Sequence, residues 1–307
     1  MRVAGIEEFG GPVKALEVPD PRALRGTEVL IAVKAAGVGN WEDLVRTRDW
    51  DVGGAPPMAL GVEAAGVVVA VGEGVERWSV DDEVLTHPVP LVDQGTWAPS
   101  LIAEAGLLAR KPADVSWASA GAFPVRALTA MQVLDEGLDL KAGETLLVNG
   151  AGTVTGGLIV SLAALRGAHV LATAGPSSRE RVKRAGAETV FDYHDPDWTA
   201  QVLEATAGRG VDAAANAAPG GAATTLATVR DGGRLATITV DPPDAERGVE
   251  IASVIVRPEA AQLELATQEL AAGRLELEIG ASFPLAEADA ALAHAVAGHG
   301  GAVVLEL

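Results

Sequence analysis

The residues with the clearest chemical role form a glycine-rich turn between two apolar stretches. Residues 145–148 predict a short buried strand, 149–157 form the turn, 158–166 are apolar at helical spacing, and 168–174 predict a second strand. This order is a βαβ unit of about 30 residues, the setting in which such a turn binds a dinucleotide. The turn needs positions without side chains because the backbone must approach a pyrophosphate, and the helix N-terminus offers unpaired N–H groups. The sequence therefore predicts a dinucleotide site, with a tight connection that binds nothing as the alternative.

The turn departs from the usual glycine spacing at one position. Thr153 stands between Gly150 and Gly156, where a middle glycine is usual. We still expect the turn to contact the dinucleotide through Gly150, Gly152, Thr153, Val154, Thr155 and Gly156. Asn216, Ala217 and Ile238, at or near the ends of two later predicted strands, complete the set expected to surround the cofactor.

The end of the second strand indicates which dinucleotide is bound. Proteins that bind NAD usually place Asp or Glu there to accept a hydrogen bond from the ribose 2′-OH. Here no carboxylate follows the strand until Glu180, and the intervening residues include Ser177, Ser178 and Arg179. Two hydroxyls and a guanidinium suit a 2′-phosphate, because Arg donates two parallel N–H groups to phosphate oxygens. The sequence therefore predicts NADPH; in the alternative, Ser177 caps a helix and Arg179 is solvated.

The composition restricts the class of protein and of partner. A length of 307 residues suggests about two domains, and 23 Lys and Arg against 42 Asp and Glu give a net charge of −19. Such a surface repels nucleic acid and anionic membranes. Without cysteine there is neither a disulfide nor a thiolate metal site. We see no signal peptide and no apolar run of about 20 residues, which predicts a cytoplasmic protein.

The predicted elements that position the turn fall into two groups. Short strands separated by Gly and Pro predict a small barrel-like β domain; they cover residues 2–7, 27–35, 61–71, 84–86 and 97–103. From Ser116 onward strands alternate with helices, which predicts a parallel sheet with helices on both faces. A helix over 286–296 and a strand over 302–307 end the chain.

Several motifs, in the same order along the chain, resemble the medium-chain dehydrogenase/reductase superfamily, and most closely its zinc-free quinone oxidoreductase branch. The matching stretches are 35–38, 60–68, 71–75, 128–132, 143–145, the glycine-rich turn, 186–187, 192–193, 232–235 and 283–285. The resemblance implies an α/β fold with two domains and an active cleft between them. Residues 1–118 and 274–307 would form a GroES-like β-rich domain, and 119–273 a Rossmann nucleotide-binding domain with a doubly wound parallel sheet.

The resemblance also bears on metal and phosphate binding. Zinc-dependent relatives ligate the metal at two positions that are Gly39 and Val62 here, and neither side chain has a donor atom. We therefore expect no metal. Tyr193 follows the next strand, where the resembled family has a tyrosine close to the 2′-phosphate. The histidines show no pair at ligand spacing and are expected at the surface or in packing; they are His87, His169, His194, His294 and His299.

Four residues are candidates on the substrate side. The resembled family usually has Asn at the Gly39 position, and here the amide is shifted to Asn40, the candidate hydrogen-bond donor to a developing oxyanion. Thr129 matches a family threonine near the nicotinamide, with helix packing as the alternative. Trp41 and Trp50 flank a Gly/Pro loop and are candidate walls for a planar apolar substrate, with core filling as the alternative.

The expected function is zinc-independent hydride transfer from NADPH to a quinone or an α,β-unsaturated carbonyl, so the partner is a small apolar molecule. A non-catalytic NADPH-binding protein with a structural or sensing role is the alternative. Nucleic-acid binding is disfavoured by the net charge, and no membrane partner is expected. Residues 249–256 predict an apolar edge strand of the nucleotide domain. The resembled family pairs such edges, so we expect a homodimer through this strand.

Overall fold

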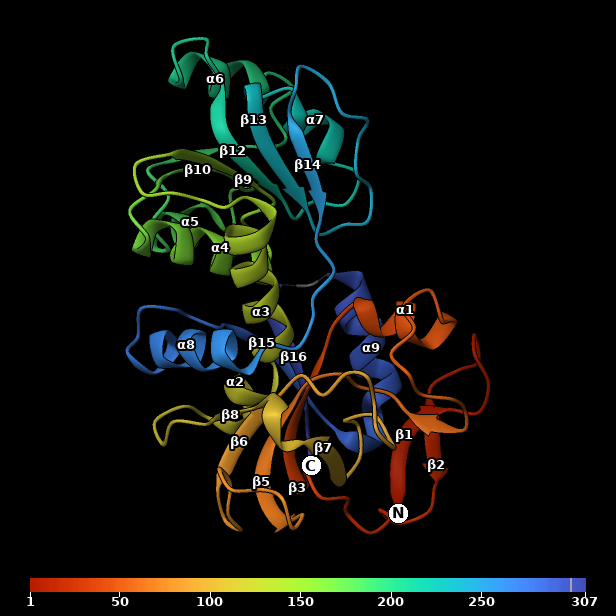
Figure 1. Ribbon diagram of the computed structural model, residues 1–307. Coiled ribbons are helices and arrows are strands. Elements are labelled where there is room, and N and C mark those ends of the chain that lie inside the picture. The colour runs from red at the N-terminus through yellow and green to blue at the C-terminus, as the bar shows by residue number, and fades with distance from the viewer. Residues whose placement is uncertain (299) are drawn as a thin grey trace. The chain divides into compact units, whose positions relative to one another are not determined.

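The computed structural model describes residues 1–298 and 300–307, which form two compact units (Figure 1). Unit 1 contains residues 1–125, 257–272 and 277–307, and unit 2 contains residues 126–256 and 273–276. His299 lies outside the described residues.

The units differ in three places from the domains expected from the sequence. Residues 119–125 and 257–272 group with the β-rich unit, each with a helix, and residues 274–276 group with unit 2. Helix α2 (Trp117–Gly121) packs on strand β3 (Glu28–Val38), and helix α8 (Ala260–Ala271) packs beside strand β8 (Leu108–Arg110). Periodicity predicts that α8 is a helix, but it does not reveal which apolar surface the helix covers.

Unit 2 is built on a parallel sheet with the strand order β11-β10-β9-β12-β13-β14. The strands are β9 (Thr145–Asn149), β10 (His169–Thr173), β11 (Thr189–Phe191), β12 (Val211–Asn216), β13 (Val229–Thr237) and β14 (Glu250–Ser253). The helices between them are α4 (Val154–Leu165), α5 (Arg179–Arg184), α6 (Trp198–Ala205) and α7 (Ala222–Leu226). The order 3-2-1-4-5-6 in chain sequence is that of a doubly wound dinucleotide-binding fold, which confirms the expected fold class.

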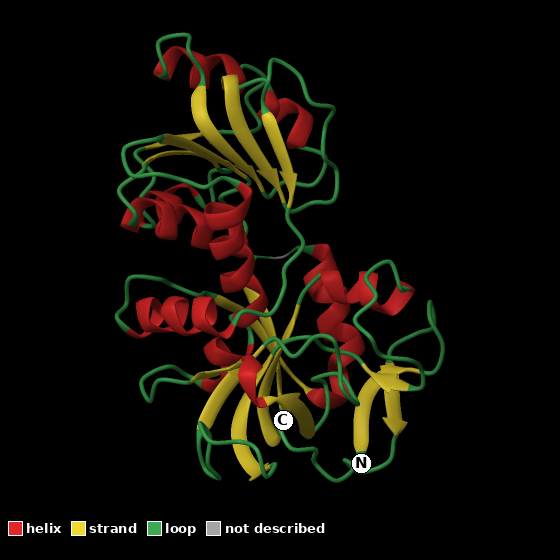
Figure 2. Ribbon diagram, viewed as in Figure 1, coloured by secondary structure: helices red, strands yellow, loops and turns green. Residues whose placement is uncertain are grey.

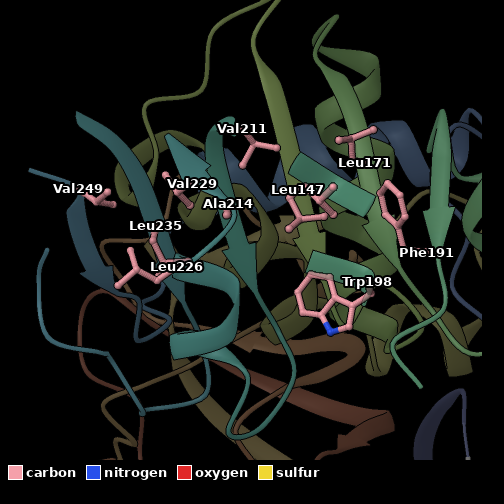
Figure 3. Packing of buried hydrophobic residues seen from close by; sticks show 11 residues of the cluster. Leu147, Leu171, Phe191, Trp198, Val211, Ala214, Leu226, Val229, Leu235 and Val249 are labelled. Carbon is pink, nitrogen blue, oxygen red and sulfur yellow. The ribbon is translucent and has the colours of Figure 1, made fainter. Parts of the chain in front are cut away.

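One row of side chains across this sheet explains how its register is held (Figure 3). Leu171, Leu147, Ala214 and Leu235 are paired in register on four neighbouring strands and belong to one buried cluster. Trp198 of α6 packs into the same cluster. Since alternate residues of a strand point to opposite faces, a slip of one residue would move this row out of the cluster.

Unit 1 contains the β-rich part of the fold (Figure 2). Its strands are β1 (Arg2–Ile6), β2 (Lys14–Glu17), β3, β4 (Met58–Ala59), β5 (Ala64–Val71), β6 (Glu83–Thr86), β7 (Ser100–Glu104), β8, β15 (Ile279–Pro284) and β16 (Ala302–Glu306). One sheet has the order β2-β1-β4, and a larger one has the order β15-β16-β3-β5-β6-β8. Strand β7 also pairs with β3, so β3 is the strand on which the larger sheet is assembled.

The remaining helices join or cover these sheets. Helix α1 (Trp41–Thr47) follows β3, and α9 (Ala288–Ala297) packs against β15 and β16. Helix α3 (Pro124–Gln132) begins at a proline, which suits the first helical position, and leads the chain into unit 2 through a π-helical turn, Val133–Gly137. Within residues 1–298 and 300–307, no helix is long and apolar enough to cross a bilayer.

Strand β14 is an edge of the unit 2 sheet and carries the prediction about assembly. It pairs with β13 and is shorter than the strand expected over residues 249–256. Ile255, two residues beyond it, is 63% exposed. The edge strand of a sheet has unpaired backbone N–H and C=O groups along one side, so it is open to pairing with a second chain.

We predict that the protein is a homodimer with a two-fold contact through β14, because a two-fold axis pairs one edge with its own copy. Sedimentation at micromolar concentration should give a dimer, and Ile255→Lys should shift it toward monomer. Val69→Lys, on the exposed part of β5, is the matched control and should leave the dimer intact. A monomeric wild type, or a dimer unaffected by Ile255→Lys, contradicts this prediction.

Candidate active site

The carboxyl ends of three central strands of unit 2 are joined by buried polar side chains. Asn149, Thr173 and Asn216 are the last residues of β9, β10 and β12. Thr173 Oγ1 donates to Asn149 Oδ1 (2.6 Å), and Asn149 Nδ2 donates to Asn216 Oδ1 (3.0 Å) and to Thr225 Oγ1 (2.9 Å). All four side chains are buried. The network therefore holds together the carboxyl ends of the strands, where dinucleotides bind in this topology.

The glycine-rich turn follows directly and has no room for larger residues at two positions. Gly150 has φ +81°, and a Cβ there would lie 2.8 Å from the carbonyl carbon of Ala217. A Cβ at Gly156 would lie 2.3 Å from the carbonyl oxygen of Gly150. Both positions thus require glycine.

Thr153 is the N-cap of α4, which explains why a threonine stands here instead of the usual middle glycine. Its Oγ1 accepts a hydrogen bond from the Gly156 N–H (3.0 Å) and donates to the Gly150 carbonyl (2.9 Å). Val154 and Thr155 form the first turn of α4, where N–H groups have no acceptor within the helix. These two N–H groups are the donors left for an anion at the helix N-terminus.

Residues from two loops meet around Gly175, beyond the end of β10. Ser178 N–H and Arg179 N–H each donate to the Gly175 carbonyl (3.1 Å), and a Cβ at Gly175 would lie 3.4 Å from Cε1 of Tyr193. The structure thus brings together three of the residues predicted to bind the 2′-phosphate, while Ser177 is exposed in the preceding turn.

The other predicted cofactor residues lie at the same edge. The Ala217 N–H donates to the Asn149 carbonyl (2.8 Å), and the Ile238 N–H donates to the Asn216 carbonyl (3.1 Å). Gly152 adjoins Ser178, since a Cβ at Gly152 would lie 2.6 Å from Ser178 Oγ, and its carbonyl accepts from Arg181 (2.9 Å). Sequence reasoning missed Asn149 and Thr173; polar residues that end apolar strands are the signal that identifies them.

In unit 1, the Trp41 ring fills the space beside Gly39. A Cβ at Gly39 would lie 2.3 Å from Cε2 and Cζ2 of Trp41. Asn40 is the N-cap of α1, is exposed, and makes no side-chain capping bond. The indole therefore covers the position at which the resembled family has a polar side chain.

The loop Gly61–Glu63 is held by side chains from separate elements. Glu42 Oε2 and Oε1 accept from the N–H groups of Gly61 and Val62 (both 3.2 Å). His87 Nδ1 lies 2.6 Å from the Val62 carbonyl, which only accepts, so Nδ1 carries the proton. Glu63 Oε2 accepts from Val125 N–H (2.8 Å). Sequence reasoning had no signal for Glu42, whose partners are 19 and 20 residues away.

Burial sets the protonation of this cluster. Burial first, and the charge of Glu63 second, raise the pKa of Glu42 to about 8, although the two backbone N–H groups oppose the shift. Burial lowers the pKa of His87 to about 4. Near neutral pH the loop therefore holds a protonated Glu42 and an uncharged imidazole.

The two remaining substrate-side candidates are in different units. Trp50 is half-buried in unit 1, and its ring centroid lies 6.1 Å from that of His87. Thr129 is buried on α3 in unit 2.

The metal prediction follows from Gly39 and Val62. Neither offers a donor atom, Val62 is buried, and no three His, Cys, Asp or Glu side chains are grouped for a metal ion in the described part of the chain. We predict that dialysis against a strong chelator changes neither the melting temperature nor any activity, and that elemental analysis finds far less than one zinc per chain. Stoichiometric zinc that survives gel filtration contradicts this.

Comparison with known families agrees with this architecture. Residues 25–112 match the family model described as alcohol dehydrogenase GroES-like domain, and residues 185–305 match that described as zinc-binding dehydrogenase. The chloroplast envelope quinone oxidoreductase homolog of Arabidopsis thaliana is 30% identical over 269 residues, which cover 81% of this chain and 80% of that protein. The chain belongs to the medium-chain dehydrogenase/reductase superfamily, in its quinone oxidoreductase-like branch.

Solved structures with this fold include members of the superfamily that bind different cofactors. A mycobacterial protein in complex with NADPH has a TM-score of 0.84 and 26% identity, and an NAD-dependent alcohol dehydrogenase has a TM-score of 0.88 and 26% identity; both alignments cover 100% of each chain. Erythronolide synthase EryA2 of Saccharopolyspora erythraea is 36% identical over 200 residues, 64% of this chain. The chain spans only 5% of the length of that synthase.

Proposed function

We propose that this medium-chain dehydrogenase/reductase binds NADPH and catalyses hydride transfer to a quinone or an α,β-unsaturated carbonyl. The observation that carries the proposal is the group of residues around Gly175: Ser178, Arg179 and Tyr193 meet there, and β10 ends without a carboxylate. An Arg and hydroxyl groups favour a 2′-phosphate over a free ribose 2′-OH. The quinone oxidoreductase name of the Arabidopsis relative and the NADPH bound to the mycobacterial protein support this reading.

The glycine-rich turn fits the pyrophosphate of such a cofactor, since Gly150 and Gly156 leave the backbone bare and α4 begins at Thr153. When bound, NADPH supplies the hydride. In unit 1, Trp41 and Trp50 offer flat apolar surface to a planar substrate. The exposed Asn40 amide supplies a hydrogen bond to the carbonyl oxygen of the substrate, which gains negative charge as the hydride is transferred. Thr129 orients the nicotinamide carboxamide.

The experiment is a panel of quinones and enones with matched saturated ketones, in which oxidation of NADPH and of NADH is followed by absorbance. We expect turnover with NADPH on quinones or enones and none on the saturated ketones. Tight NADPH binding without turnover on any panel member points to the non-catalytic alternative. Faster turnover with NADH overturns the cofactor assignment.

A further inference from the structure

His194 lies beside Gly175, the glycine around which the residues expected to bind phosphate are grouped, and it contacts Tyr193 and Asp192. Its ring lies 4.1 Å from the Tyr193 ring, at an interplanar angle of 30°. Its Nδ1 lies 2.7 Å from Asp192 Oδ1, which also accepts from the His194 main-chain N–H (3.0 Å). A Cβ at Gly175 would lie 3.4 Å from His194 Cε1. The imidazole therefore borders Gly175, whose carbonyl accepts from the main chain of Ser178 and Arg179.

The hydrogen bonds determine which nitrogen is left for a ligand. Since Nδ1 is paired with Asp192, Nε2 is the ring nitrogen that remains for an outside partner. The charged and titratable groups around the ring are Asp192 and Tyr193 on its own loop and Arg179 on α5, whose charge acts on Asp192. Arg179 and His194 thus both interact with Asp192, and a phosphate offers both side chains a common partner.

We propose that His194 binds the 2′-phosphate of NADPH through Nε2, as a second side chain beside Arg179, and that Asp192 positions its ring. This inference rests on the NADPH assignment above and adds a residue to it. The bond is charge-assisted when the imidazole is protonated. Because the side chain is 61% exposed, solvent weakens the contact, and we expect it to contribute about three- to tenfold in affinity.

The test uses two ligands that differ only in the 2′-phosphate, 2′,5′-ADP and 5′-AMP, titrated by calorimetry into the full chain. His194→Gln should weaken 2′,5′-ADP about three- to tenfold and leave 5′-AMP unchanged, and His194→Lys should restore most of the loss. His169→Gln is the matched control, because His169 also pairs with a carboxylate (Glu188, 2.8 Å), is 59% exposed, and begins β10 at the opposite edge of the sheet.

The outcomes separate the two proposals. If the wild type binds both ligands equally, or neither, both the NADPH assignment and the His194 inference fail. If the wild type prefers 2′,5′-ADP and His194→Gln keeps that preference, the inference alone fails. A loss in His194→Gln that affects both ligands equally, or a similar loss in His169→Gln, also overturns it, because such losses reflect packing or bulk charge.

Discussion

Replacing Arg179 with alanine is expected to weaken NADPH binding about ten- to a hundredfold and to leave NADH binding unchanged. A charge-assisted hydrogen bond to a phosphate contributes roughly 1.5–3 kcal/mol, and each 1.4 kcal/mol is a tenfold change in affinity. Arg179 is half-buried, so salt should reduce the difference, and the lower end of the range is expected at physiological ionic strength.

The measurement is a titration of wild type and variant with both cofactors, followed by intrinsic tryptophan fluorescence. Arg184→Ala is the matched control, since Arg184 is an exposed arginine at the other end of α5. Equal weakening of NADPH and NADH would mean that Arg179 supports the turn or the pyrophosphate. A wild type that prefers NADH would overturn the interpretation of the whole stretch after β10.

The second large effect concerns stability. The free energy of unfolding should fall by roughly 1 kcal/mol per pH unit between pH 7 and pH 8, and Glu42→Gln should remove this fall. The pKa of Glu42 is raised from 4.5 to about 8 on folding, so the folded state binds one proton more than the unfolded state between these values. Its contribution is fully present below pH 4.5 and is lost as the pH rises through 8.

Because of His87, the pH dependence of stability that Glu42 causes can be measured without an opposing effect only in the upper part of that pH range. Its pKa falls from 6.5 to about 4 on folding, so between these values the unfolded state binds the extra proton and stability rises with pH. Up to about pH 7 the two slopes oppose each other, because the unfolded imidazole is still half protonated at pH 6.5, and above that pH the Glu42 slope dominates. Urea unfolding at a series of pH values measures the slope, with exposed Glu73→Gln as the control. A flat wild-type profile from pH 7 to pH 8 contradicts the prediction.

Unit 2, the nucleotide-binding unit, was the part of the fold that the sequence predicted best. Its strands are apolar and short, its turn requires glycine at Gly150 and Gly156, and each helix lies between two strands, so local pattern and fold agree. The sequence pattern did not predict the contacts between residues that are distant in the chain. Asn149 bonds to side chains 24 and 67 residues away, and nothing near it in the chain announces those partners.

The substrate side was less predictable from the sequence, again because its contacts join distant residues, and also because burial changes the protonation of one of its side chains. The sequence shows that Gly39 lacks a side chain, but only packing shows that the Trp41 ring occupies the space. Glu42 lies in the first turn of α1, a position that ordinarily favours negative charge. Its complete burial, which changes its protonation, depends on the fold of the loop Gly61–Glu63.

The placement of β16 has a consequence for synthesis on the ribosome. Residues 35–38 of β3 pair with β16, which is made roughly 260 residues later. At about 5–20 residues per second, that half of the β3 edge waits roughly 13–50 seconds for its partner. Residues 126–256 of unit 2 are contiguous and emerge complete in the meantime. Unit 2 is therefore free to fold first, and an apolar edge of unit 1 stays open for a chaperone or for a mispairing neighbour until the last strand arrives.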